Sequence, residues 1–74
     1  NITCLRVNRD SGSIIGKPLK ELHLRKNFGI NILGITRNDE FKQNIHPDDQ
    51  IIHQDTLFIN GKTQDIERFR KALN

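Results

Sequence analysis

Two polar side chains, Arg25 and Asn31, stand on either side of a predicted chain reversal at Phe28-Gly29. Because the chain turns back there, the two side chains can converge on one site. The Arg25 guanidinium presents a planar fork of N–H donors that suits a phosphate or carboxylate, and the Asn31 amide offers both a donor and an acceptor. Isoleucines flank Asn31, so the sequence predicts a pocket that joins an anion site to an apolar wall. The alternative is an exposed arginine and a strand-end asparagine with no ligand.

Two other patterns carry weaker chemical signals. His46, Asp48, Asp49 and His53 could ligate a metal, but no helical histidine spacing or cysteine pair accompanies them, and a solvated loop explains them. Gly61-Lys62-Thr63 echoes the end of a phosphate-binding loop, but such a loop needs a glycine five positions earlier, and the residue there is threonine. No nucleophile stands beside a base, and two adjacent carboxylates are weak evidence for acid–base work. We therefore expect neither a metal site nor an enzyme.

Composition limits the class of protein. The chain has 74 residues, of which 34% are hydrophobic and 28% charged, as expected for a single small globular domain, residues 1–74. A net charge of +3 leans mildly towards anionic partners and falls short of a dedicated nucleic-acid binder. Such a binder would also expose aromatic rings for base stacking, whereas the four phenylalanines are all expected in the core.

Further limits come from cysteine and methionine. The lone Cys4 excludes an internal disulfide and fits a reducing compartment, and its apolar strand pattern predicts that it is buried. No apolar run approaches the length of a membrane span. The chain has no methionine, so we expect it to be a piece of a larger protein.

Hydrophobic patterning predicts an α+β fold in the order β-α-β-β-β-α. Apolar residues recur with a helical spacing at Ile66, Phe69 and Leu73, so the last element is a helix. The Asn44–Gln54 segment is a loop by composition. The other expected elements are strands at Ile2–Asn8, Ile30–Arg37, Phe41–Gln43 and Thr56–Asn60, and a helix at Pro18–His23.

The Ile30–Arg37 strand predicts how the small sheet is covered, because it does not alternate cleanly. Strict alternation would place Ile30 and Ile32 on one face, and Leu33 and Ile35 on the other. Helices can cover one face of a sheet this small. We therefore expect the domain to form a homodimer through the other face.

The order of motifs resembles the TrkA-C domain, the C-terminal lobe of RCK-type regulators of potassium channels and transporters, and most closely those of Ktr-type uptake systems. The likeness runs from about Ser11 to Phe69. Two positions depart from the family pattern: Gln54 stands where glycine is usual, and His23 where an acidic residue is common. The motifs are Gly16–Leu22, Leu24–Ile32, Ile35–Arg37 and Asp55–Gly61.

The resemblance implies a cytoplasmic, homodimeric regulatory domain without catalysis or a cofactor. It would lie at the inner face of the membrane through a potassium channel or transporter subunit, with no nucleic-acid partner. In several members a groove at the two-fold axis binds cyclic di-AMP. Carried over, Arg25 would pair with a phosphate and Asn31 would hydrogen-bond phosphate or base. The implied apolar lining is Leu19, Ile30 and Ile32, and the adenine side would be closed by Pro47 with Asn44 or His46. The alternative within the family is a pure dimerisation or assembly module without a nucleotide ligand.

Overall fold

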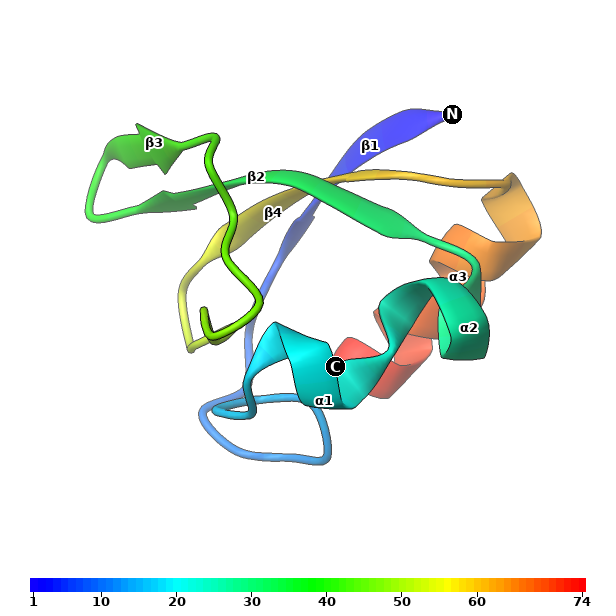
Figure 1. The fold of residues 1–74 in the computed structure, drawn as a ribbon, viewed down its shortest axis with the longest axis horizontal. Helices are drawn as coiled ribbons and strands as arrows, with labels where there is room; N and C mark the ends of the chain where they lie inside the picture. The colour runs from blue at the N-terminus through cyan, green and yellow to red at the C-terminus, as the bar shows by residue number, and fades with distance from the viewer.

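The computed structural model describes residues 1–74 and contains a four-stranded antiparallel sheet with three helices on one face (Figure 1). The strands lie in the order β1-β4-β2-β3, so the first and last strands of the chain are neighbours. This arrangement confirms the α+β class. The elements are β1 (Ile2–Arg6), α1 (Leu19–Leu22), α2 (Leu24–Phe28), β2 (Asn31–Arg37), β3 (Glu40–Lys42), β4 (Thr56–Asn60) and α3 (Thr63–Leu73).

The segment between β1 and β2 holds two short helices where the sequence predicted one. The first helix ends early because His23 adopts a left-handed backbone with φ of 47°. A second helix, α2, then replaces the expected turn and ends at Gly29, whose φ of 71° is available to glycine without steric cost. Neither helix exceeds five residues. Elements this short carry too little periodicity to be separated by pattern alone.

A β-bulge in β2, between Ile32 and Gly34, changes which side chains share a face. Across the bulge, Ile32 and Ile35 both lie opposite core residues of β4. The expectation that Ile32 and Ile35 point to opposite faces is therefore wrong, because the extra residue in the strand shifts the alternation by one. Ile30 and Ile35 are buried, and Leu33 is exposed.

The face of the sheet opposite the helices carries apolar side chains of its own. Cys4 and Phe58 lie in one row with Gly34, and the Phe41 ring packs edge-on against Phe58 with ring centroids 5.4 Å apart. Phe41 also covers Gly34 so closely that any side chain there would collide with the ring. Phe41 is 56% exposed and Ile2 71%. We call Ile2, Cys4, Phe41 and Phe58 the outer patch.

The outer patch corrects two expectations. Cys4 is exposed rather than buried, and of the four phenylalanines expected in the core, Phe41 and Phe58 are not core residues. Alternation tells which residues share a face, but it does not tell whether that face is covered.

One apolar core lies between the sheet and the helices, and α3 contributes the residues that its spacing predicted, Ile66, Phe69 and Leu73. The Phe69 ring also meets Phe28 of α2 edge-on. None of the helices has the length and apolar character needed to cross a bilayer. The remaining core residues are Leu5, Val7, Ile14, Leu22, Ile30, Ile35, Ile51, Leu57 and Ile59.

The backbone of Gln54 generates a prediction about stability. This residue precedes β4 with a left-handed φ of 74°, which costs an L-residue about 1–2 kcal/mol. Glycine removes that cost, but its greater conformational freedom in the unfolded chain lowers the free energy of unfolding by about 0.5–1 kcal/mol. We expect Gln54→Gly to raise the free energy of unfolding by about 0.5–1 kcal/mol in urea titrations. Gln43→Gly, at an exposed position without a positive φ, is the control and should give no gain. An equal gain in both variants would contradict the assignment.

Candidate functional site

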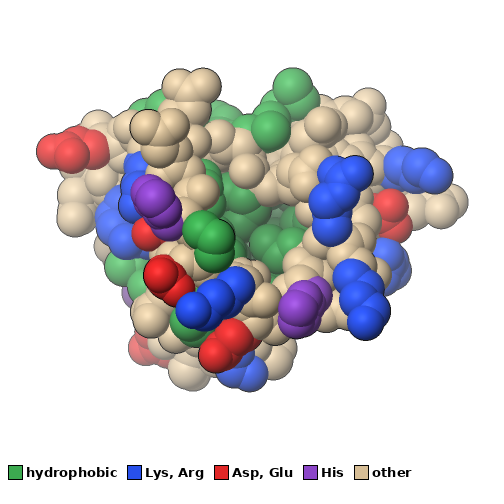
Figure 2. Space-filling view, in the orientation of Figure 1, with side chains coloured by type: hydrophobic (Ala, Val, Ile, Leu, Met, Phe, Trp, Pro, Cys, Tyr) green, Lys and Arg blue, Asp and Glu red, His purple; other side chains and the backbone are tan.

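A cavity of about 320 Å³ opens beside the first half of β2, between the two short helices and the loop of residues 44–54. Figure 2 shows a hollow with hydrophobic side chains in its floor and charged and histidine side chains around its rim. The cavity lies on the helix side of the sheet, not on the face that carries the outer patch. Seven of the residues named from the sequence line it: Leu19, Arg25, Ile30, Asn31, Ile32, His46 and Pro47.

The local fold explains how Arg25 and Asn31 reach one cavity. Arg25 lies on α2, which ends at Gly29, and Asn31 begins β2 directly after the reversal. The Gly29 N–H donates to the Arg25 carbonyl at 2.9 Å, which fixes the turn. Arg25 takes part in none of the chain's five ion pairs. Its guanidinium is therefore available to an anion in the cavity.

Three further residues line the cavity that were not predicted from the sequence, Lys20, Leu24 and Ile45, whereas the predicted Asn44 does not line it. In the sequence, Lys20 has the pattern of an ordinary charged residue on the exposed side of a helix. Its place at the rim depends on contact with the loop, which no local pattern reveals. Only Ile45 could have been predicted, because an isolated apolar residue in a polar loop indicates that the loop packs on another surface there.

Backbone hydrogen bonds join the wall formed by His46 and Pro47 to α1. The Lys20 N–H donates to the Pro47 carbonyl at 2.9 Å, and the Leu19 N–H donates to the Asp49 carbonyl at 2.8 Å. The two short segments therefore form one continuous side of the cavity. Neither segment belongs to the sheet, so the position of this side depends on what anchors the loop.

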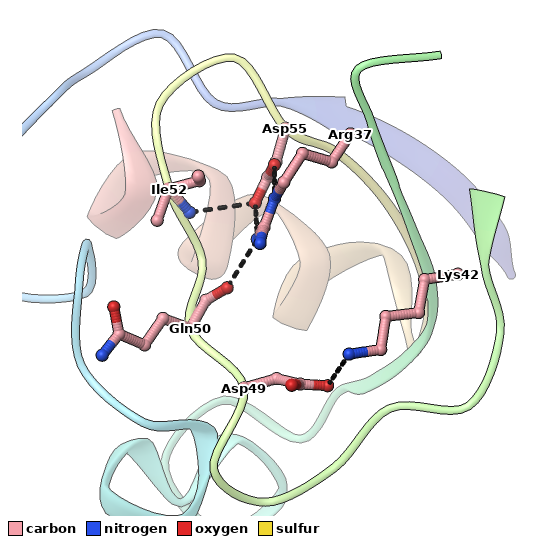
Figure 3. A network of polar contacts seen from close by, with 6 residues as sticks. All are labelled: Arg37, Lys42, Asp49, Gln50, Ile52 and Asp55. Carbon is pink, nitrogen blue, oxygen red and sulfur yellow. Dashed lines mark hydrogen bonds and ion pairs between the residues drawn. The ribbon is translucent and has the colours of Figure 1, made fainter. Parts of the chain in front are cut away.

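The anchor is a buried carboxylate at the end of the loop (Figure 3). Asp55 is completely buried and accepts hydrogen bonds from Arg37 Nε and Nη2, both at 2.8 Å, and from the Ile52 N–H at 2.9 Å. Arg37 also donates to the Gln50 carbonyl at 2.9 Å. The hydrogen bond to Asp55 raises the pKa of Arg37 above its ordinary value, against the opposing effect of burial. β2 thereby holds the loop at two points.

A second anchor joins the loop to β3. The Lys42 ammonium lies 2.9 Å from the Asp49 carboxylate, which also accepts the His46 N–H at 2.8 Å. These contacts, the one with Lys42 first, lower the pKa of Asp49 below its ordinary value. Asp48 instead pairs with Lys20. The acidic and histidine residues of the loop are thus spread over separate partners, and no three metal-ligating side chains come together.

The sequence model of the TrkA-C domain matches residues 4–74. No curated protein is similar enough in sequence to match.

Several solved structures are similar to this chain. The C-terminal RCK domain of the potassium transport protein KtrA, in complex with cyclic diadenosine monophosphate, is 30% identical with a TM-score of 0.81, over 95% of this chain and 79% of that one. The RCK_C domain dimer of S. agalactiae BusR, in complex with the same dinucleotide, is 22% identical with a TM-score of 0.88, over 99% of this chain and 89% of that one.

A longer BusR chain is bound to its busAB-promotor DNA. It is also 22% identical with a TM-score of 0.88, and the match spans 99% of this chain but 35% of that chain. At this identity the BusR structures show that the fold is shared.

The second anchor predicts a pH dependence. Because the pKa of Asp49 is lowered in the folded state, its contribution to stability is complete above the unfolded-state pKa and is lost as pH falls through the folded-state pKa. At neutral pH we expect Asp49→Asn to lower the free energy of unfolding by about 1 kcal/mol or less, since Lys42 is half exposed. The difference from wild type should vanish on acidification. Asp10→Asn, an exposed aspartate without an ion pair, is the control in denaturant titrations. A difference that persists at low pH would contradict this account.

Proposed function

The chain belongs to the TrkA-C domain family, and from that premise we propose that it is a ligand-sensing regulatory domain that binds cyclic di-AMP between two copies. The observation that carries the proposal is the cavity in which the unpaired Arg25 stands beside Asn31 over an apolar floor. Two similar domains, those of KtrA and BusR, are structures in complex with this dinucleotide.

The lining fits one nucleotide half of such a ligand. The Arg25 fork can take a phosphate by charge-assisted hydrogen bonds, and the Asn31 amide can bind phosphate or base. Leu19 and Ile32 offer an apolar surface to a purine ring. The wall of His46 and Pro47, joined to α1 by backbone hydrogen bonds, would enclose the base on the loop side of the cavity.

The size of the cavity supports a site shared by two copies. Its volume of about 320 Å³ is at the lower end of the range of about 300–1,000 Å³ typical of small-molecule sites. A cyclic dinucleotide is two-fold symmetric, so each half can meet the same Arg25 and Asn31 pair from one of two symmetry-related copies. Ligand bound at that seam would also strengthen the dimer by linkage.

We further propose that the parent protein regulates a potassium channel or transporter subunit from the cytoplasmic side of the membrane. The KtrA likeness, at 30% identity, supports this placement. If the ligand favours one arrangement of the two copies, that preference can be passed to the attached transport protein. The absence of catalysis and of a nucleic-acid partner stays a prediction. The DNA-bound BusR chain does not decide the second point, because this chain spans about a third of it.

Calorimetry with cyclic di-AMP tests the proposal. We expect wild type to bind one ligand per two chains. Arg25→Ala should weaken binding by about a hundredfold or more, because each of two guanidinium contacts is worth about 1.5–3 kcal/mol. Lys26→Ala removes the neighbouring charge, which does not line the cavity, and should bind as wild type. If the Arg25 and Lys26 variants bind equally well, Arg25 does not contact the ligand. If wild type shows no heat of binding, cyclic di-AMP is not the ligand.

One observation favours a second candidate function, a pure assembly module. The outer patch leaves Ile2 and Phe41 more than half exposed, which is typical of a surface that docks on another protein. In this case a ligand-free dimer forms through the face opposite the helices, as expected from the sequence.

Equilibrium sedimentation without ligand tests the assembly module. It predicts a ligand-free dimer that Phe41→Ser weakens by about tenfold or more, because the ring loses its apolar contact. Phe41→Leu keeps an apolar side chain and is the control. A ligand-free wild-type monomer, or a dimer that Phe41→Ser leaves unchanged, would reject this candidate.

A further inference from the structure

We propose that Lys20 is a further ligand-contacting residue of the cavity, and that Asp48 competes with the ligand for its ammonium group. The inference rests on the proposed function, because it concerns the same site. On this proposal, Lys20 favours a doubly charged phosphodiester over an uncharged nucleoside.

Lys20 occupies the junction of the two segments that form one side of the cavity. Its backbone N–H donates to the Pro47 carbonyl at 2.9 Å, so its Cα is fixed next to the wall that would close on the adenine. Lys20 is one of the residues that line the cavity. The ammonium lies 2.8 Å from the Asp48 carboxylate at the rim.

The ion pair between Lys20 and Asp48 is weak enough for Lys20 to leave Asp48 and bind a ligand phosphate instead. Its side chains are 59% and 81% exposed, and ion pairs so exposed to water are weak. Lysine is a compact charge on a flexible stem, so its ammonium can move to a phosphate while the backbone stays in place. A phosphodiester held by Arg25 would offer that ammonium a partner inside the cavity.

The balance of charge around the cavity gives Asp48 its role. Arg25 and Lys20 are the lining residues with a permanent positive charge, and no carboxylate lines the cavity. Asp49 is engaged with Lys42. Asp48 is therefore the carboxylate that neutralises a lining cation, and its presence sets how much positive charge an anionic ligand meets.

The test measures cyclic di-AMP binding by calorimetry for wild type, Lys20→Met, Asp48→Asn and the double variant. We expect Lys20→Met to weaken binding by about five- to tenfold and Asp48→Asn to tighten it by about two- to fivefold, the range of a partly exposed charge contact. In the Lys20→Met background, Asp48→Asn should have no effect. Glu67→Gln makes the same charge change in an exposed ion pair of α3 with Arg70 and should leave binding unchanged.

The outcomes separate the two proposals. No binding by wild type would overturn the proposed function and this inference with it. Wild-type binding together with an unchanged Lys20→Met affinity would overturn this inference alone. A gain from Asp48→Asn that persists without Lys20 would also overturn it, since the aspartate would then act by direct repulsion of the ligand. The melting temperatures of all variants should match wild type, which excludes a folding defect as the cause.

Discussion

The buried Asp55 carboxylate is the constraint on which the candidate site depends. A carboxylate withdrawn from water is tolerated only when it is paired and hydrogen-bonded, and here Arg37 and the Ile52 N–H together supply three donors. Arg37 belongs to β2 and Asp55 to the end of the loop before β4, so the requirement for pairing holds that loop against the sheet. The Gln50 carbonyl shares the same guanidinium. Together with Ile51, which is buried in the core shared with the sheet, this pairing gives the irregular segment one conformation.

That conformation decides where the cavity lies. Once the loop is anchored at Arg37, its backbone bonds to Leu19 and Lys20 hold α1 in place, and α1 has only four residues and little stability of its own. β2 supplies the floor, because Ile30 and Ile32 lie on the core side of the strand, where Ile32 pairs with the buried Ile59 of β4. Strand, loop and helix each contribute lining residues, and none of them would form the cavity alone.

Local chemistry was enough to predict much of this from the sequence. The strands, the α3 face and the convergence of Arg25 with Asn31 follow from alternation, helical spacing and a glycine at a reversal. The bulge could not be predicted, because one extra residue in a strand changes no composition and reverses every later side chain. The exposure of Phe41 could not be predicted either, because the sequence does not distinguish a ring that packs over Gly34 on the outer face from an aromatic residue of the core. Lys20 was not predicted because its place at the cavity depends on contact with a loop nearly thirty residues away in the chain.

Under the proposed function, the separation of the two surfaces bears on how regulation could work. The cavity opens on the helix side of the sheet, whereas the outer patch lies on the opposite face. A ligand in the cavity can change the arrangement of two copies only if it binds one arrangement better than another. The contacts able to provide that difference belong to α1, α2 and the loop, which are short and lie outside the sheet. The outer patch belongs to the hydrogen-bonded sheet and shares no residue with the cavity, so a partner docked there would leave the seam at the cavity free to respond. A domain of 74 residues can in this way hold a fixed surface and a ligand-dependent one on the two faces of a single sheet.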